Sequence, residues 1–321
     1  MRPSSPERRR RDAHLRPESR PLIHGKGRDR AEVVAAVNHW PRAVETHRAA
    51  HPGALHFCED AAILDPTALP AHDLLLASPS CTGHTRARGK ERPHHDAARA
   101  TAWCVLRVAE AHRPRAVVVE NVPEFLRWTC YRGWRLALSD LGYRISEQVL
   151  DAADVGVPQH RRRLFVVAIR ARRPLAIAPG TATHVPARAV VDLDAGRWSP
   201  WREYVAASVA RIEAARARYG EACLVAYYGN DAGRSLDVPL GTITTVAKHM
   251  VVRGEVARML SVDELLAAQS FPADYPLTGN VGERVMQVGN SVPPKLARHV
   301  VAQVHEGAEE AVEHDQHTAV V

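Results

Sequence analysis

The chain has 321 residues, of which 45% are hydrophobic and 25% charged, and a formal net charge of +7. These values are ordinary for a globular protein and leave room for one large or two modest domains, each with its own core. No apolar run approaches the roughly 20 residues that a transmembrane helix needs, and no apolar stretch follows the arginine-rich start, which excludes a secretory signal. We therefore expect a cytoplasmic protein without a membrane partner.

The cysteines and histidines do not form a metal or disulfide pattern. The cysteines are odd in number, scattered and without a Cys-x-x-Cys pair: Cys58, Cys81, Cys104, Cys130 and Cys223. Such spacing argues for a reducing compartment and against a disulfide framework or a zinc site. The 18 histidines are spread along the chain, so no metal is expected.

The positive charge is concentrated at the start of the chain. Residues 1–30 hold ten basic and four acidic side chains, so residues 31–321 have a net charge of only +1. This start is rich in Arg, Pro and Ser and lacks apolar periodicity, which predicts a disordered basic segment. The overall charge of residues 31–321 therefore does not indicate nucleic-acid binding, and only local motifs can predict it.

From residue 31 onward, apolar runs alternate with helical patterns. Strands are predicted at 33–37, 73–77, 116–119 and 164–169, and helices at 43–50, 97–112, 136–141, 261–268 and 293–305. Gly142 is expected to end one helix, and Ser261 with Glu264 to form a capping box at the start of another. The alternation predicts an α/β fold with a doubly wound, mostly parallel sheet.

Composition divides the chain further. Residues 171–255 are rich in Pro, Gly, Thr and Arg and have only short apolar runs, which predicts a smaller, irregular second domain. Residues 31–170 and 256–305 are expected to form the larger domain together. The polar residues 306–321 are expected to be a frayed tail.

Two reactive side chains follow predicted strands. Cys81 comes after the strand at 73–77, within Ser-Pro-Ser-Cys-Thr, and Glu120 directly follows the strand at 116–119. Ligands in open α/β sheets bind at the carboxyl ends of the strands, so these residues are candidates for a nucleophile and an acid. The alternative interpretations are a small buried hydrophobe for Cys81 and a solvated strand end for Glu120.

Five ordered blocks resemble the C5-cytosine DNA methyltransferase family. They lie at 78–81, 120–122, 159–163, 258–272 and 289–294, and the resemblance covers about residues 33–301. It implies a Rossmann-like methyltransferase domain with a target-recognition domain, double-stranded DNA as partner and S-adenosyl-L-methionine as methyl donor. A monomer is expected, with a cognate restriction endonuclease as a functional partner.

The resemblance also implies roles for individual residues. Cys81 would add to carbon 6 of a flipped-out cytosine, while Glu120 would act near ring nitrogen 3. Arg161 and Arg163 would both face the active site, one touching the cytosine carbonyl and one supporting the acid. DNA contacts are expected from Arg86, Arg88, Lys90, Arg162, Thr244 and Thr245.

The cofactor site is expected at the strand ends. The residues expected to bind it are Asn38, His39, Trp40, Asp60, Pro79, Asn290 and Ser291, with Trp40 over the adenine. The family's first strand and glycine-rich loop have no convincing counterpart, since a Gly-x-Gly at 25–27 in a charged segment is a weak signal. The abrupt change in composition at residue 31 suggests that residues 1–30 are out of frame or that the start site is misassigned. For the chain as written, we expect weak cofactor binding and poor stability.

Other functions remain open from the sequence. The chain could be a catalytically impaired, DNA-binding remnant of the family, or an RNA cytosine methyltransferase of the same architecture. A thiol-dependent hydrolase using Cys81 and His84 is a further alternative, although no oxyanion-hole pattern supports it.

Overall fold

The computed structural model describes residues 31–80, 101–227 and 231–318, with side chains up to residue 308. The strands are β1 (Ala35–Val37), β2 (Leu55–Phe57), β3 (Leu74–Ala77), β4 (Ala116–Asn121), β5 (Arg144–Asp151), β6 (Arg162–Ile169), β7 (Ser199–Pro200), β8 (Ala222–Ala226), β9 (Arg234–Ser235), β10 (His249–Arg253) and β11 (Val256–Met259). The helices are α1 (Pro41–Ala50), α3 (Ala102–His112), α4 (Tyr131–Asp140), α5 (Ala206–Tyr219), α6 (Val262–Ala268), α7 (Val281–Asn290) and α8 (Pro294–Thr318). The predicted disordered segment at 1–30 lies outside the described residues.

The largest α/β unit is built on a four-stranded sheet in the order β3-β4-β6-β5. Only β3 and β4 pair in parallel, and β6 is antiparallel to both of its neighbours. The α/β class is confirmed, and the sheet is mixed: β3, β4 and β5 run in one direction, and β6 runs against them. The predicted mostly parallel sheet is therefore corrected at β6. Strand β5 was not predicted, because polar side chains interrupt its apolar positions, and a short connection then returns the chain antiparallel as β6.

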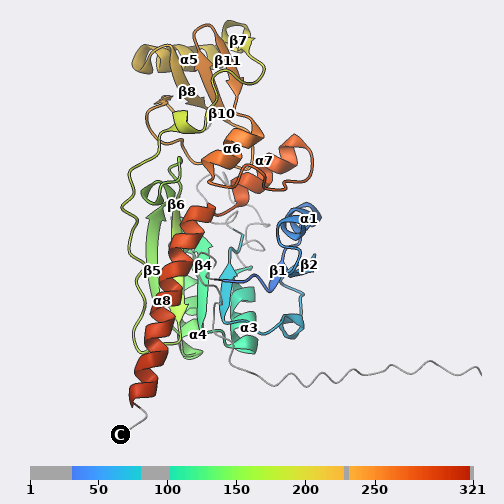
Figure 1. Ribbon diagram of the computed structural model, residues 1–321, viewed down its shortest axis with the longest axis vertical. Helices are drawn as coiled ribbons and strands as arrows, with labels where there is room; N and C mark the ends of the chain where they lie inside the picture. The colour runs from blue at the N-terminus through green and yellow to red at the C-terminus, as the bar shows by residue number, and fades with distance from the viewer. Residues whose placement is uncertain (1–30, 81–100, 228–230, 319–321) are drawn as a thin grey trace, which may run out of the picture.

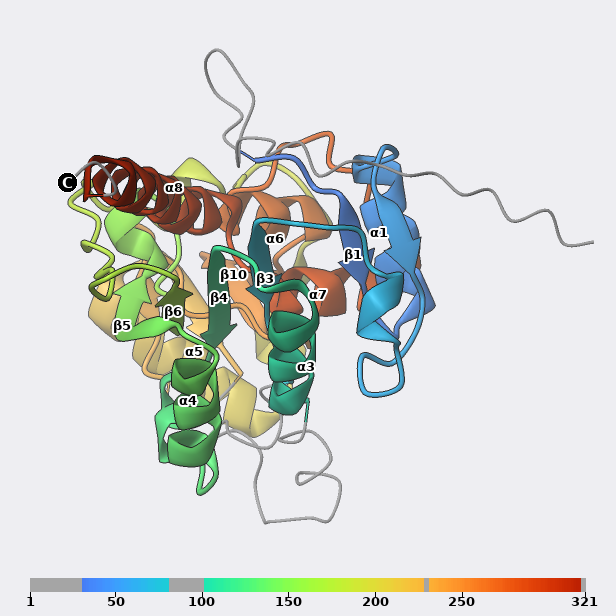
Figure 2. The same cartoon turned by 90° about the horizontal axis from the view of Figure 1, so that it is seen from below.

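Helices cover both faces of this sheet, with α3 and α4 on one side and α8 on the other (Figure 2). Alternate residues of β4 point to opposite faces, as the pleat of a strand requires. Val117 and Val119 pack in the core beside α3 and α4, whereas Ala116 and Val118 pack in the core beside α8. The sheet is therefore buried on both faces, which fixes where its strand ends lie.

The first two strands form a separate parallel pair, β1–β2. The predicted buried strand at 33–37 is shorter than expected, since Val33 and Val34 are 40% and 39% exposed. Within the described residues, β1 pairs only with β2, and Leu76 on β3, the end strand of the four-stranded sheet, is 55% exposed. A strand with only one hydrogen-bonded neighbour is less completely covered than a central strand.

The second domain is more regular than predicted. A five-stranded sheet in the order β7-β11-β10-β8-β9, with antiparallel pairing throughout, lies at one end of the molecule with α5 (Figure 1). The predicted irregular domain is therefore wrong in this respect: short strands and a helix were hidden by their Arg- and Ala-rich composition. The sheet includes β11, so it continues past the predicted boundary at residue 255.

The two faces of the small sheet pack against different partners. Val225 and Val252 pack with Ile212 of α5, in a cluster internal to the small domain. Leu224 and Val251 face the other way and share a cluster with residues of α6 and α7. This shared cluster joins the small domain to the rest of the chain.

The C-terminal helices are close to prediction except at the tail. Ser261 caps α6 and forms the predicted capping box with Glu264. Helix α8 continues to Thr318, so the frayed tail expected from residue 306 is wrong over most of its length. Its apolar contacts reach residue 308: Ala308 is buried, and Gly307 packs closely against the Leu175 side chain. No helix in the described ranges combines the length and apolar character needed to cross a membrane.

Candidate active site

Glu120 and Arg163 meet at the end of the four-stranded sheet where the carboxyl end of β4 lies. Glu120 lies near the end of β4 and Arg163 near the start of β6, and these strands are antiparallel neighbours. Glu120 Oε1 lies 3.1 Å from Arg163 Nε, and both side chains are largely shielded from solvent. A carboxylate held by a guanidinium in such a place is fixed in position and partly desolvated.

The segment that leads to Cys81 ends beside Glu120. Strands β3 and β4 run in parallel with Ala77 opposite Val119, so their carboxyl ends lie side by side. Asn121 donates a hydrogen bond from Nδ2 to the carbonyl of Pro79 at 3.0 Å, and the Ser80 N–H donates to Thr101 Oγ1, also at 3.0 Å. These bonds fix the residue before Cys81 next to the strand of the carboxylate. Cys81, Arg86, Arg88 and Lys90 themselves lie outside the described residues.

Arg161 holds two backbone carbonyl groups from distant segments. Its side chain is buried, with NH1 donating to the carbonyl of Ile243 at 3.0 Å and NH2 to that of Gly289 at 2.8 Å. Of the two arginines, Arg163 is the one that contacts the Glu120 carboxylate among the described residues. The expectation that Arg161 also lines the active site stays a prediction, since Cys81 lies outside the described residues. Arg162, between them, is exposed, as the alternating side-chain directions at the start of β6 require.

The segment around Thr244 and Thr245 packs directly on the end of α7. A Cβ on Gly289 would lie 2.4 Å from the Thr244 carbonyl carbon and oxygen and 2.6 Å from the Thr245 nitrogen. Thr245 is exposed, while the Thr244 hydroxyl donates to the carbonyl of Val246 at 2.9 Å. Only glycine allows the two backbones to approach this closely.

This contact predicts a large effect of a small substitution. Gly289→Ala should destabilise the protein by about 1–3 kcal/mol, because the new methyl group must displace backbone rather than a flexible side chain. Chemical unfolding in urea measures the difference. Gly133→Ala is the matched control: it lies in α4 with nothing within 4 Å of its Cβ position, so it should be neutral or slightly stabilising. Equal stability of the two variants would contradict the close contact.

The expected cofactor residues of the N-terminal part lie at the ends of β1 and β2. The Asn38 N–H donates to Phe57 O at 3.1 Å and the Glu59 N–H to Asn38 O at 3.2 Å, which brings these two turns together. Asn38 Oδ1 accepts from the Trp40 N–H at 2.9 Å, and Trp40 is half-buried. Asp60 Oδ1 accepts from the Ala62 N–H.

These residues suit the adenosine part of a cofactor, since an aromatic ring and polar groups adjoin each other. On the C-terminal side, Asn290 is exposed and Ser291 is hydrogen-bonded to Gln269. Thr46 of α1 and Thr278, before α7, bond through their hydroxyls at 2.9 Å, which holds the two halves of this region together. His39 is exposed beside Trp40. The described residues supply no glycine-rich loop for the methionine part.

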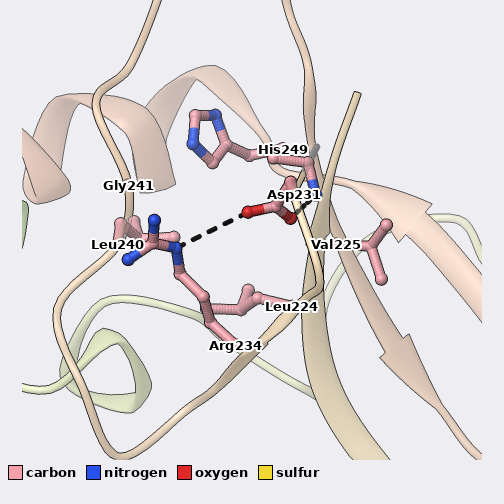
Figure 3. A pocket seen from close by; sticks show the side chains of 8 residues that line it. Leu224, Val225, Asp231, Arg234, Leu240, Gly241 and His249 are labelled. Carbon is pink, nitrogen blue, oxygen red and sulfur yellow. Dashed lines mark hydrogen bonds and ion pairs between the residues drawn. The ribbon is translucent and has the colours of Figure 1, made fainter. Parts of the chain in front are cut away.

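A further buried polar group, for which no role was predicted from the sequence, lies in the small domain. His249 is 5% exposed and lines a small cavity with Asp231, Arg234, Leu240 and Gly241 (Figure 3). Burial lowers the pKa of His249 to about 4; Arg234 acts in the same direction, while Asp231 opposes the shift. The histidine is therefore neutral at physiological pH. The apolar run that follows it in the sequence could have predicted its burial.

This neutral histidine makes stability depend on pH. The unfolded chain takes up a proton near pH 6.5 but the folded chain only near pH 4, so stability should fall as pH drops through this window, by about 3 kcal/mol in total. His249→Gln should remove that part of the dependence. Burial also lowers the pKa of His47 to about 4, so the difference between the two proteins, measured by urea unfolding from pH 7.5 to 4.5, isolates His249. If the two proteins showed the same change of unfolding free energy with pH, His249 would not be the cause of this dependence.

Among the described residues, no group of three or more His, Cys, Asp or Glu side chains is placed to hold a metal ion. The site as described therefore consists of a paired carboxylate at a strand end, a neighbouring strand that leads to a cysteine, and a polar region beside Trp40. These elements lie in an α/β domain whose helices α6 and α7 pack against the small sheet.

Comparison with known proteins assigns the family. Residues 23–197 and 213–306 match the family of C-5 cytosine-specific DNA methylases, and the chain belongs to this family. It is 27% identical over 288 residues to the type II methyltransferase M.HgiDI of Herpetosiphon aurantiacus, covering 83% of this chain and 84% of the relative. It is 24% identical to M.NlaX of Neisseria lactamica, covering 82% and 85%.

A solved structure agrees with the fold. A DNMT2 mutant of Spodoptera frugiperda superposes with a TM-score of 0.62 at 17% identity, covering 85% of this chain and 92% of that one. At this identity, the comparison concerns the architecture alone.

Proposed function

We propose that the protein transfers the methyl group of S-adenosyl-L-methionine to carbon 5 of a cytosine flipped out of double-stranded DNA, through a covalent adduct with Cys81. Family membership supports the reaction, and the Glu120–Arg163 pair beside the end of β3 is the structural observation that supports this site. The related type II methyltransferases support a role alongside a cognate restriction endonuclease. We expect a cytoplasmic monomer.

The division of roles follows from the chemistry of cytosine. Carbon 5 is too weak a nucleophile until the Cys81 thiolate bonds to carbon 6 and makes the ring enamine-like. Charge then develops at ring nitrogen 3, where a hydrogen bond from the Glu120 carboxyl group would stabilise it. Arg163 holds the Glu120 carboxylate from one side, so that its other oxygen can be directed at the base. After methyl transfer, loss of the carbon 5 proton and of the thiolate restores aromaticity.

Cofactor and DNA would occupy the two sides of the base. Asn38, His39, Trp40, Asp60, Pro79, Asn290 and Ser291 are the proposed cofactor residues, and the bound cofactor supplies the methyl group. Arg162 and Thr245 are exposed and are proposed to contact DNA with Thr244. Arg86, Arg88 and Lys90 are proposed to bind phosphates.

Covalent trapping tests the proposal. The full chain is incubated with S-adenosyl-L-methionine and a pool of random-sequence duplexes that contain 5-fluorocytosine, from which the carbon 5 substituent cannot leave as a proton. We expect an adduct that survives denaturing electrophoresis, is lost in Cys81→Ser and is kept in Cys58→Ser, since Cys58 is another exposed thiol. A matching pool of fluorinated RNA tests the RNA alternative. A folded protein that binds DNA but forms no adduct would be the impaired remnant.

A further inference from the structure

Two glutamine side chains form a buried connection across the molecule. Gln159 precedes β6 and Gln269 follows α6, and both are 0% exposed. Gln159 Nε2 donates to Gln269 Oε1 at 2.5 Å. Buried amides are stable only when their hydrogen-bonding groups are satisfied, so the arrangement around this pair is tightly restricted.

The far ends of the pair reach two regions that the proposed function uses. Gln159 Oε1 accepts from the N–H of Ile243 at 2.7 Å, directly before Thr244 and Thr245. Gln269 Nε2 donates to Ser291 Oγ and to the Ser291 carbonyl, both at 3.1 Å, and to the Val288 carbonyl at 2.9 Å. Three side chains thus connect the segment proposed to meet DNA with the segment proposed to meet the cofactor.

The donor and acceptor of each hydrogen bond in this series, from Ile243 to Ser291, are fixed. Because Gln159 Oε1 must accept from a backbone N–H, its amide nitrogen must face Gln269. Gln269 must then present its oxygen to Gln159 and its nitrogen to Ser291. Turning either amide over would place oxygen against oxygen or nitrogen against N–H in a buried site, so one amide cannot reorient without the other.

A second contact runs parallel to the first. Arg161 holds the carbonyl of Ile243 with one nitrogen and that of Gly289 with the other, at 3.0 and 2.8 Å. Both backbone polar groups of Ile243 are therefore held by side chains that precede or begin β6. The backbone of Gly289 also contacts the backbone of Thr244 and Thr245 directly, without any intervening side chain.

We propose that Gln159 and Gln269 are positioning residues that couple segment 243–245, which carries the proposed DNA contacts Thr244 and Thr245, to the proposed cofactor residue Ser291. The coupling is reciprocal, as linkage requires: ordering of either segment favours the ordered state of the other. Neither glutamine touches a reacting atom. The two ends have their ligands only if the proposed function holds, but the mechanical connection between them can be tested without any ligand.

Hydrogen exchange on the ligand-free full chain provides that test. Gln269→Met has a similar volume but no amide, and it does not touch Ile243 itself. We expect the Ile243 N–H to exchange at least fivefold faster in this variant, together with the N–H groups of 288–291. Gln148→Met, at a half-buried glutamine on β5 outside the connection, should leave the Ile243 rate unchanged. An unchanged Ile243 rate in Gln269→Met would overturn the proposal.

A milder variant covers the case in which Gln269→Met does not fold. Ser291→Ala removes only the hydroxyl that accepts from Gln269 and donates to the Val288 carbonyl at 2.8 Å. It should raise the Ile243 exchange rate at least twofold. A change confined to residues 288–291 would show that the effect stops at Gln269 and would refute coupling.

Binding then relates the connection to the two sites. With S-adenosylhomocysteine as probe, we expect calorimetry to show at least fivefold tighter binding when the duplex pool is present, the lower range of typical couplings. Gln269→Met should reduce that ratio to below twofold, and Gln148→Met should keep it; a merely structural role would lower stability but leave the ratio unchanged. Absence of all probe binding by the folded wild type would count against the proposed function, while the ligand-free exchange still decides the coupling.

Discussion

Replacing Glu120 with glutamine is expected to slow methyl transfer by roughly a hundredfold to ten-thousandfold, the usual contribution of a positioned acid. Glutamine keeps the size of the side chain, and its oxygen can still accept from Arg163, so the pair should survive structurally. What is lost is the carboxyl group that would stabilise charge at ring nitrogen 3. Single-turnover transfer of a radiolabelled methyl group to unmethylated DNA measures the effect.

Glu147→Gln provides the matched comparison. Glu147 lies on β5 of the same sheet and also accepts from an arginine, with Arg135 Nε at 2.7 Å, but it also accepts from the Tyr131 hydroxyl and lies on the outer strand. Its substitution should change the rate less than threefold, consistent with an exposed ion pair. If both substitutions slowed the reaction equally, the loss would come from the sheet as a whole rather than from Glu120.

Replacing Arg258 is expected to have the second large effect, a loss of unfolding free energy. Its guanidinium forms two bonds of 2.7 Å to the carboxylate of Glu264, and both side chains are buried. Burial alone would raise the pKa of Glu264, but hydrogen bonds from Arg258 and from the backbone N–H groups of Ser261 and Asp192 outweigh it and lower the pKa. Arg258→Met should therefore cost about 3–5 kcal/mol, because it leaves the carboxylate buried without its partner.

A double substitution separates the causes. Arg258→Met combined with Glu264→Leu removes both charges and should recover much of the lost stability in urea unfolding, since replacing a whole buried pair costs far less than breaking it. The lowered pKa of Glu264 also predicts a sign for the pH dependence. The pair stabilises fully above the ordinary carboxyl pKa, and this stabilisation is lost as pH falls through the lower folded value. A double variant as unstable as Arg258→Met would argue against this account.

Local signals predicted much of the fold. The apolar runs that became β3, β4 and β6, and the Ser261–Glu264 capping box, are short-range patterns that need no tertiary information. Strand direction was not available in the same way, because β6 is as apolar as a parallel strand and is buried on both faces. The small domain was misjudged for a different reason: its strands are short, and the Ala- and Arg-rich α5 has a weak pattern, so its packing against β8 and β10 was not visible in the sequence.

The candidate site shows a similar division. The family resemblance implied that an arginine of the 161–163 run supports Glu120. Arg163 meets Glu120 because β6 runs antiparallel to β4, which brings the start of β6 to the carboxyl end of β4. The carbonyl partners of Arg161 could not be predicted from sequence, since Ile243 and Gly289 lie 82 and 128 residues away. The same holds for Gln159 and Gln269, whose burial depends on contacts 110 residues apart.

The family resemblance implies that the small domain reads the DNA target, and on that proposal the two-sided packing of its sheet would restrict how the protein could acquire a new target. The face toward α5 packs only within its own domain, so substitutions there can be compensated locally, around Ile212 and Val225. The opposite face shares its packing with α6 and α7, so changes there also disturb the catalytic half. A graft from a relative should therefore take α5 with its own sheet face and retain the host's residues at Leu224 and Val251. On this proposal, the exchangeable part of the domain ends at the sheet itself, whose inner face belongs to the core shared with α6 and α7.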